Sequence, residues 1–145
     1  MMNRIKIIST AQIEQEVIML VKCSKPFRHQ LSENNVYLVI EILTKFSNKS
    51  VSYRLIDNEG YPSIYDADRF EVVSNKIDNF AVLLNDDGII LSHELIVNSE
   101  LNIKSIDGFW GLFIEDDIDA KQILKEVIKD LSIKEKYNST TFSVI

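Results

Sequence analysis

The first half of the chain alternates short apolar runs with polar turns, a pattern that predicts β-strands. Runs rich in β-branched and aromatic residues cover residues 16–23, 36–44, 51–57, 61–65 and 70–73, and a weaker run covers residues 4–9. Asn58, Glu59 and Gly60 form a turn signal in which the glycine supplies a positive φ. Five short strands at this spacing predict a small barrel or a sharply bent sheet.

The second half begins with a predicted β-hairpin. Residues 80–84 and 89–91 are apolar and flank the turn sequence Asn85-Asp86-Asp87-Gly88. Residues 93–97 extend this hairpin or add a strand. The segment FWGLFI at residues 109–114 has strand composition and is apolar on both faces, so we expect a central strand that is covered on both sides.

An amphipathic helix is the clearest element near the C-terminus. Its apolar positions follow the helical period and are Ala120, Ile123, Leu124, Val127, Ile128 and Leu131. Asp119, three residues before Gln122, is the expected N-cap, and Asp117 is the alternative. We expect the apolar stripe to pack on the sheet that the second-half strands form.

These elements predict an α+β fold. Its first part, residues 1–76, is a small SH3-like β-barrel or bent sheet with an N-terminal extension. Its second part, residues 77–145, is an acidic unit with a β-hairpin, a strand and one C-terminal amphipathic helix on the sheet. A chain of 145 residues is long enough for one domain with a real core, so the two parts are expected to pack as one compact unit.

Composition favours a cytoplasmic protein. The longest apolar run, residues 17–21, is far below the roughly 20 residues that span a bilayer, so no membrane segment is expected. The N-terminal residues show no secretory signal. The single cysteine, Cys23, cannot form an internal disulfide, which suits a reducing compartment.

The net charge is unevenly distributed along the chain. Residues 1–76 carry a net charge of +1 and residues 77–145 a net charge of −7, which together give −6. Between residues 77 and 119 there are ten carboxylates and a single base, Lys104. This excess repels phosphate backbones, so a nucleic acid partner is not expected, and it favours a basic protein partner. The simpler interpretation, that the acidic excess only keeps the protein soluble, stays open.

Catalytic and metal-binding motifs are not found. The acidic run at residues 115–119 lacks the central glycine and the final glutamate of a calcium loop, and it lacks the flanking residues of a two-metal nuclease. Cys23, His29 and His93 do not show zinc-ligand spacing. We therefore expect no enzyme activity, no cofactor and no metal. A metal-dependent hydrolase that uses the acidic cluster is the third-ranked hypothesis.

Trp110 allows two interpretations. Tryptophan often anchors protein interfaces, and acidic neighbours suit a basic partner. Because both faces of the predicted strand around Trp110 are apolar, the core interpretation is favoured.

The segment YRLIDNEGYPSIYDADRFEVV at residues 53–73 resembles the distal half of the SH3-like small barrels of bacterial and phage proteins. The segments VKCSKPF and VYLVIEI resemble the opening strands of the same module, so the resemblance covers residues 17–73. It implies a strand, an acidic-glycine turn, a short Tyr-bearing strand, a one-turn helix and a final strand. The chain departs from this module by its N-terminal extension and by Ile64, where such modules often have tryptophan.

In size, acidity and lack of catalytic motifs, the chain also resembles immunity proteins of bacterial contact-dependent and polymorphic toxin systems. That resemblance implies a cytoplasmic inhibitor that covers the active site of a basic toxin domain, with nucleases among the candidates. The alternative hypothesis is a phage or mobile-element accessory protein whose SH3-like module binds a protein. The candidate partner-binding residues are the acidic ones at the predicted turns and before the helix: Asp78, Asp86, Asp87, Asp107, Glu115, Asp116 and Asp117.

Overall fold

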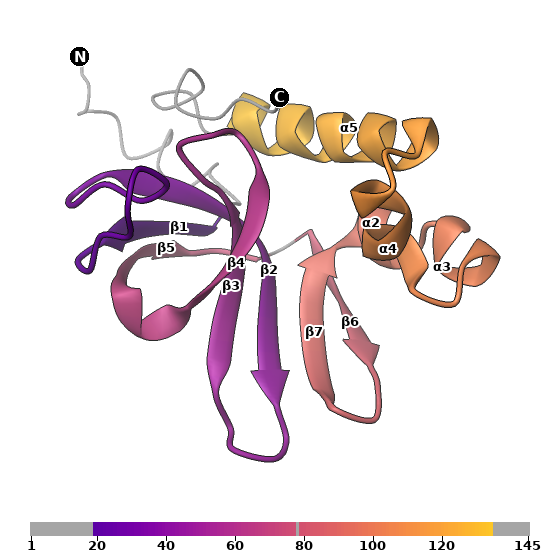
Figure 1. Ribbon diagram of the computed structural model, residues 1–145, viewed down its shortest axis with the longest axis horizontal. Coiled ribbons are helices and arrows are strands. Elements are labelled where there is room, and N and C mark those ends of the chain that lie inside the picture. The colour runs from indigo at the N-terminus through magenta and orange to yellow at the C-terminus, as the bar shows by residue number, and fades with distance from the viewer. Residues whose placement is uncertain (1–18, 78, 135–145) are drawn as a thin grey trace.

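The computed structural model describes residues 19–77 and 79–134 and shows an α+β fold with a mostly antiparallel, open sheet (Figure 1). The strands are β1 (Met19–Cys23), β2 (Val36–Lys45), β3 (Val51–Ile56), β4 (Pro62–Asp66), β5 (Phe70–Asn75), β6 (Phe80–Leu84) and β7 (Gly88–His93). The helices are η1 (Ala67–Arg69), α2 (Glu94–Val97), α3 (Leu101–Lys104), α4 (Gly108–Ile114) and α5 (Ile118–Lys134). The predicted strand at residues 4–9 and the candidate residue Asp78 lie outside the described residues.

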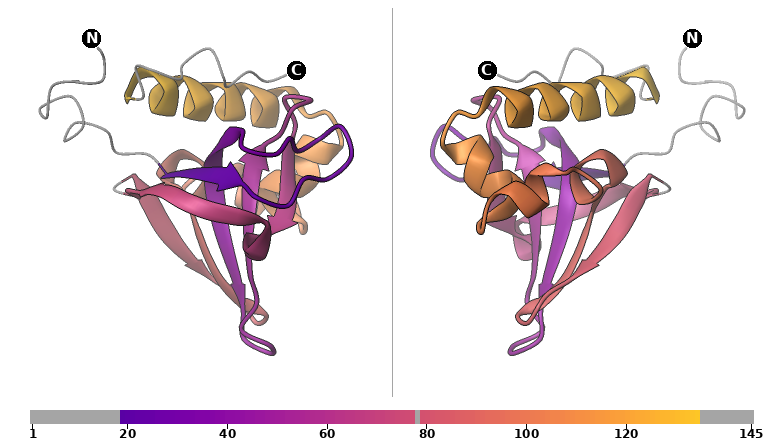
Figure 2. Two further views of the ribbon diagram at one scale, coloured as in Figure 1. Left: turned by 90° about the vertical axis from the view of Figure 1, so that its left-hand side faces the viewer. Right: turned by 90° about the vertical axis from the view of Figure 1, so that its right-hand side faces the viewer.

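Strand β2 is the centre of the sheet because it pairs with three others. One edge of β2 pairs with β3. The other edge pairs with β1 from Val36 to Val39 and then with β7 from Glu41 to Lys45. The sheet therefore divides into two branches, one ending in β5 and the other in β6 (Figures 1 and 2).

A β-bulge lies in β2 where the pairing changes branch, between Val39 and Glu41. Side chains normally alternate between the faces of a strand, and a bulge shifts that alternation by one residue. As a result Ile40 packs in the core beneath the helices, and Glu41 binds Trp110 of α4 on the same side. Ile42 packs on the opposite side of the sheet.

Each face of the sheet carries its own core. One core joins Leu20, Leu38, Ile40 and Ile56 to α4 and α5. The other lies within the curled β1–β5 sheet, where aromatic and aliphatic side chains pack together: Met19, Val21, Cys23, Leu31, Tyr37, Val39, Tyr53, Leu55, Tyr65 and Phe70. Both cores use side chains of β1, β2 and β3, so these three strands connect the whole described molecule.

The turn between β3 and β4 forms as predicted. Gly60 has a φ of 73°, in the left-handed region that glycine adopts without steric cost. Asp57 organises the turn, because its Oδ1 accepts hydrogen bonds from the backbone N–H groups of Glu59 and Tyr61. Its Oδ2 accepts a hydrogen bond from the Tyr65 hydroxyl, and burial together with this bond raises the pKa of Tyr65.

The strands predicted in the first half are confirmed within the described residues, and so is the β6–β7 hairpin. The elements after the hairpin differ from the prediction. Residues 94–97 form α2 and do not continue as a strand, and the polar segment that follows contains α3.

The largest error concerns FWGLFI, which is helix α4 and not a central strand. Phe109 and Phe113, four residues apart, are both buried, whereas Ile114 is 69% exposed. The buried side chains thus recur at the spacing of one helix face, whereas the predicted strand would have buried side chains on both of its faces. In a run of six apolar residues the two periodicities are hard to tell apart, and the tertiary contacts decide between them.

The C-terminal helix is confirmed, but two details of its prediction are wrong. It begins at Ile118, so the alternative N-cap, Asp117, is confirmed and the preferred one, Asp119, lies in the first turn. Its apolar stripe packs on Leu20, Leu38, Ile40 and Ile56 of the first-half strands, and not on a sheet built from the second half (Figure 1). No helix among the described residues is long and apolar enough to cross a membrane.

Candidate partner-binding surfaces

The structure separates the predicted acidic residues into two groups. Asp86 and Asp87 form the turn between β6 and β7, whereas Asp107 precedes α4 and residues 115–117 join α4 to α5. Figure 1 shows the β6–β7 turn at the far end of the sheet from these helices. The six described members therefore do not form one continuous acidic surface.

The acidic residues between α4 and α5 end one helix and begin the next. Asp116 has a φ of 65°, and its N–H donates to the carbonyl of Phe113, while the Asp117 N–H donates to the carbonyl of Leu112. This pair of bonds around a left-handed residue is the Schellman motif that terminates helices. The Asp117 carboxylate then accepts the N–H of Ala120 at 3.0 Å, which makes it the N-cap of α5.

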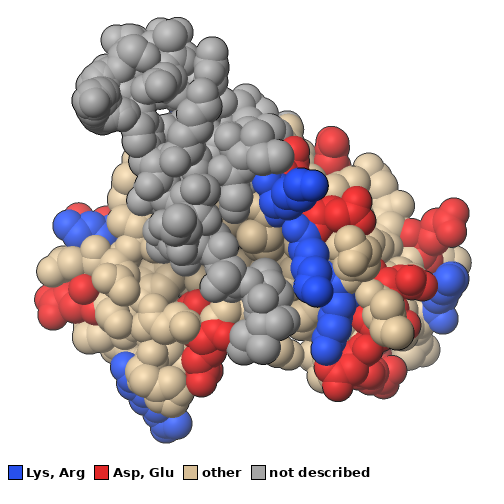
Figure 3. Space-filling view, turned by 90° about the horizontal axis from the view of Figure 1, so that it is seen from above, with Lys and Arg blue, Asp and Glu red and all other residues tan. Residues whose placement is uncertain are grey.

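Basic residues also reduce the charge of this region. Lys121 forms an ion pair with Asp116 at 2.8 Å. Lys121, Lys125 and Lys129 recur every four residues in α5, and the view from above shows a row of basic side chains beside the acidic ones (Figure 3). The face around α5 is therefore mixed in charge, which weakens its attraction for a basic partner.

The other group lies where two hairpin tips meet. The Asn85 side-chain oxygen accepts the N–H groups of Asp87 and Gly88, and the Asp87 carbonyl accepts the N–H of Phe46. A Cβ on Gly88 would collide with the Thr44 carbonyl, so glycine is needed here for the close approach of β7 to β2. The two turns are thus fixed relative to each other.

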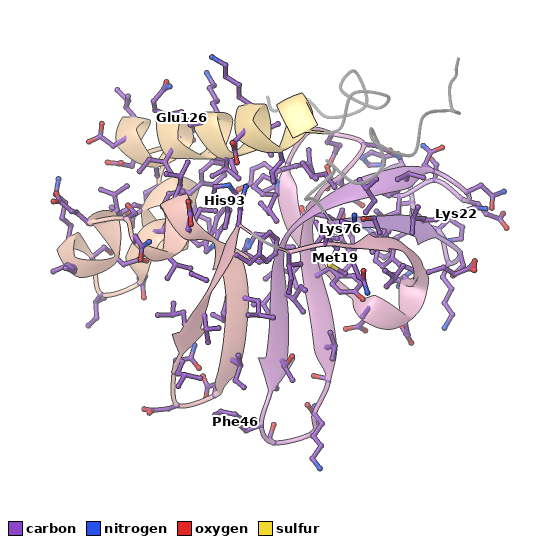
Figure 4. All side chains as sticks on the ribbon, turned by 180° about the vertical axis from the view of Figure 1, so that it is seen from behind. Met19, Lys22, Phe46, Lys76, His93 and Glu126 are labelled. Atoms are coloured by element: carbon purple, nitrogen blue, oxygen red, sulfur yellow. The ribbon has the colours of Figure 1, made fainter. Side chains whose placement is uncertain are left out.

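Exposed apolar side chains surround this acidic turn. Phe46 is 54% exposed, Val82 58% and Leu84 67%. We call the set Phe46, Val82, Leu84, Asp86 and Asp87 the hairpin end. Figure 4 shows Phe46 beside the β2–β3 turn, at the opposite end of the sheet from His93 and Glu126.

A cavity of about 530 Å³ opens at the hairpin end, lined by Lys45, Phe46, Ser47, Asp86 and Asp87. An exposed aromatic side chain and aliphatic neighbours beside carboxylates are typical of a protein-binding surface. Here two carboxylates share the cavity with one base, Lys45. The α4–α5 junction also exposes apolar side chains, Ile114 and Ile118, but there Lys121 pairs with Asp116 and Asp117 caps α5, so fewer of its carboxylates are available to a partner.

Sequence reasoning did not find the buried polar network that joins the sheet to α4. Glu41 is 3% exposed and accepts three hydrogen bonds: from Arg54 at 2.9 Å, from Ser92 at 2.8 Å and from the Trp110 indole at 2.6 Å. The Arg54 guanidinium lies 3.9 Å from the centre of the Trp110 ring. The one available signal was a glutamate inside the apolar run VYLVIEILT.

This network decides the interpretation of Trp110. The residue is half-buried and packs against the core beneath the helices, and its indole N–H is bonded to Glu41. Trp110 is therefore a partly buried residue that packs against the core and holds α4 on the sheet. This agrees with the favoured interpretation of a structural role, although Trp110 lies in a helix and not in a strand.

His93 has a defined structural role at the start of α2. Its Nδ1 accepts the N–H of Leu95, so Nε2 carries the proton and donates to Asp130 of α5 at 3.0 Å. An adjoining cavity of about 400 Å³ is lined by His93, Glu94, Leu95, Glu126, Lys129 and Asp130. The histidine thus links β7, α2 and α5.

The other residues considered for catalysis are separated. Cys23 is buried in the β1–β5 core, and burial raises the pKa of its thiol, which disfavours the reactive thiolate. His29 contacts Glu59 in an exposed loop. Within residues 19–77 and 79–134, no group of three or more His, Cys, Asp or Glu side chains is placed to hold a metal ion.

Comparison of the chain with models of protein families, with curated proteins and with solved structures gives no match. The functional interpretation therefore depends on the geometry of the chain itself.

Proposed function

We propose that the protein binds and inhibits a basic protein partner, in the manner of a toxin-system immunity protein, and that the hairpin end is its contact surface. The observation that carries this proposal is the set of exposed apolar side chains around the acidic turn of Asp86 and Asp87.

The two kinds of side chain have different tasks in this mechanism. The carboxylates attract a surface rich in lysine and arginine and so accelerate encounter. Phe46, Val82 and Leu84 then lose their contact with water, which supplies binding free energy at the centre of the interface. Inhibition follows if the bound protein covers the basic active-site cleft of its partner.

A second hypothesis is a phage or mobile-element accessory protein with an SH3-like protein-binding module. It is supported by the one-turn helix η1 followed directly by β5, an order that the resemblance implies. On this hypothesis the β1–β5 branch would hold the binding surface, and the hairpin end would be dispensable.

The test is co-expression with a basic toxin domain encoded beside this gene. Wild-type protein should restore growth, and the double variant Asp86→Lys/Asp87→Lys should associate with the toxin about tenfold more slowly at low salt. The backbone bonds to the Asn85 side chain remain available in this variant, so the turn should persist.

The matched control is Asp66→Lys/Glu71→Lys, which makes the same change in net charge at exposed positions of β4 and β5. Association that slows equally in both variants would show that only net charge matters. Growth rescue by the wild type with unchanged association of the Asp86→Lys/Asp87→Lys variant would reject the hairpin end as the site.

A further inference from the structure

The outer edge of β6 is open among the described residues. Strand β6 pairs only with β7, through Phe80 to Leu84. The Asn85 N–H donates to the Gly88 carbonyl, and the Glu94 N–H donates to the Asn79 carbonyl, so residues 79 and 85 direct their polar groups toward β7. Backbone N–H and C=O groups point to alternate sides along an antiparallel strand. The N–H and C=O groups of Val82 and Leu84 therefore point away from β7, toward the open edge.

This edge lacks the usual protection against pairing with another chain. Edge strands are commonly protected by a lysine, a proline or an inward-pointing charge. The sequence of β6, FAVLL, has none of these, and Val82, Leu83 and Leu84 are all exposed. The strand thus offers both backbone hydrogen-bonding groups and apolar side chains.

Charge indicates what kind of segment would pair there. No lysine or arginine occurs between residues 77 and 103. Asp86 and Asp87 lie at one end of β6. At the other end, His93, which pairs with Phe80, lines a cavity together with three carboxylates, Glu94, Glu126 and Asp130, and one base, Lys129.

A second copy of the chain fits this edge poorly. Antiparallel pairing of two β6 strands would bring the acidic turn of one copy near Glu94 of the other, and like charges at close range oppose association. A segment with apolar residues in its middle and lysine or arginine at its ends fits this edge better. Its apolar residues would contact the side chains of β6, and its basic ends would lie beside the acidic groups at the two ends of β6.

We propose that the β6 edge binds an extended segment of the basic partner as an additional antiparallel strand. Main-chain hydrogen bonds to Val82 and Leu84 would supply affinity, and the acidic groups at the two ends would select basic flanks. The identity of the partner rests on the proposed function, whereas the pairing with β6 is a separate statement about how binding occurs.

The experiment is to pan a displayed random-peptide library against the whole chain and to measure the binding of the enriched peptides. We expect peptides with an apolar alternating centre and lysine or arginine at the ends. Val82→Pro should weaken their binding about tenfold, because it removes one outward N–H and no bond to β7. Val82→Thr, which keeps the N–H and loses only part of the apolar contact, should weaken binding clearly less than Val82→Pro does.

Circular dichroism checks that Val82→Pro is folded. Peptides N-methylated at alternate amides test the same hydrogen bonds from the partner's side and do not depend on that variant. They should lose binding in one methylation register and keep it in the other.

The outcomes separate the two proposals. Equal binding by wild type and Val82→Pro, insensitivity to N-methylation in both registers, or failure to enrich any peptide would overturn pairing at β6. If Val82→Pro weakens binding but Asp86→Lys/Asp87→Lys does not, pairing at β6 stands and the charge-based choice of partner in the proposed function is wrong.

Discussion

At the scale of single residues, Glu41 is the most informative side chain. It is buried in the centre of the sheet, and the guanidinium of Arg54, the hydroxyl of Ser92 and the indole of Trp110 all donate to its two carboxylate oxygens. Burying a carboxylate is costly unless it is paired and hydrogen-bonded, and here three donors offset that cost. The same residue joins β2, β3, β7 and α4.

Removing this carboxylate should be strongly destabilising. Glu41→Ala leaves Arg54 largely buried without its partner, and we expect the free energy of unfolding to fall by about 3–5 kcal/mol. Urea unfolding measures this change. The double variant Glu41→Leu/Arg54→Met, which removes both charges, should lose less stability than Glu41→Ala, and a double variant that loses more would contradict the buried-pair explanation.

At the scale of elements, the segment from Gly108 to Lys134 shows how acidic residues can serve as helix signals. Asp116 takes the left-handed position that ends α4, and Asp117 caps α5 directly afterwards. Asp116 and Asp117, which were predicted to bind a partner, thus help to reverse the chain direction between two helices.

The two candidate caps can be distinguished by mutation. Asp117→Ala should lower the free energy of unfolding by about 0.5–2 kcal/mol, because the Ala120 N–H loses its acceptor. Asp119→Ala is the matched control, since Asp119 is an exposed first-turn residue whose loss removes only a weaker interaction with the helix dipole. Thermal unfolding compares the two variants, and an equal or larger effect at Asp119 would mean that α5 starts later in solution.

At the scale of the whole molecule, two cores lie on opposite faces of strands that they share. Leu20 faces α5, while its neighbours Met19 and Val21 face the β1–β5 core. Loss of β1 or β2 would expose both cores at once, so the described molecule should unfold as one cooperative unit.

Two natural probes report on the two cores. The single tryptophan, Trp110, packs against the helix-side core, and the single cysteine, Cys23, is buried in the other. In urea, the fluorescence of Trp110 and the reactivity of Cys23 toward a thiol reagent should change with the same midpoint. Distinct midpoints would show that the helices leave the sheet before the β1–β5 core opens.

The sequence by itself determined strands β1 to β5, the β6–β7 hairpin, the C-terminal helix and the acidic charge of residues 77–119. These features depend on alternation, helical periodicity, turn residues and charge, all of which act over a few neighbouring residues. It also identified Asp86 and Asp87 as candidates.

Only the tertiary structure decided that FWGLFI is a helix, that α5 covers strands from the first half, and that the acidic residues fall into two groups. It also revealed the hydrogen bonds to the buried Glu41 carboxylate and the open edge of β6. Each of these depends on contacts between segments distant in the chain: Glu41 meets Trp110 across 69 positions, and the β-bulge of β2 turns Glu41 toward that helix. No local pattern contains that information, because the same apolar run can bury one helical stripe or two strand faces until its neighbours are in place.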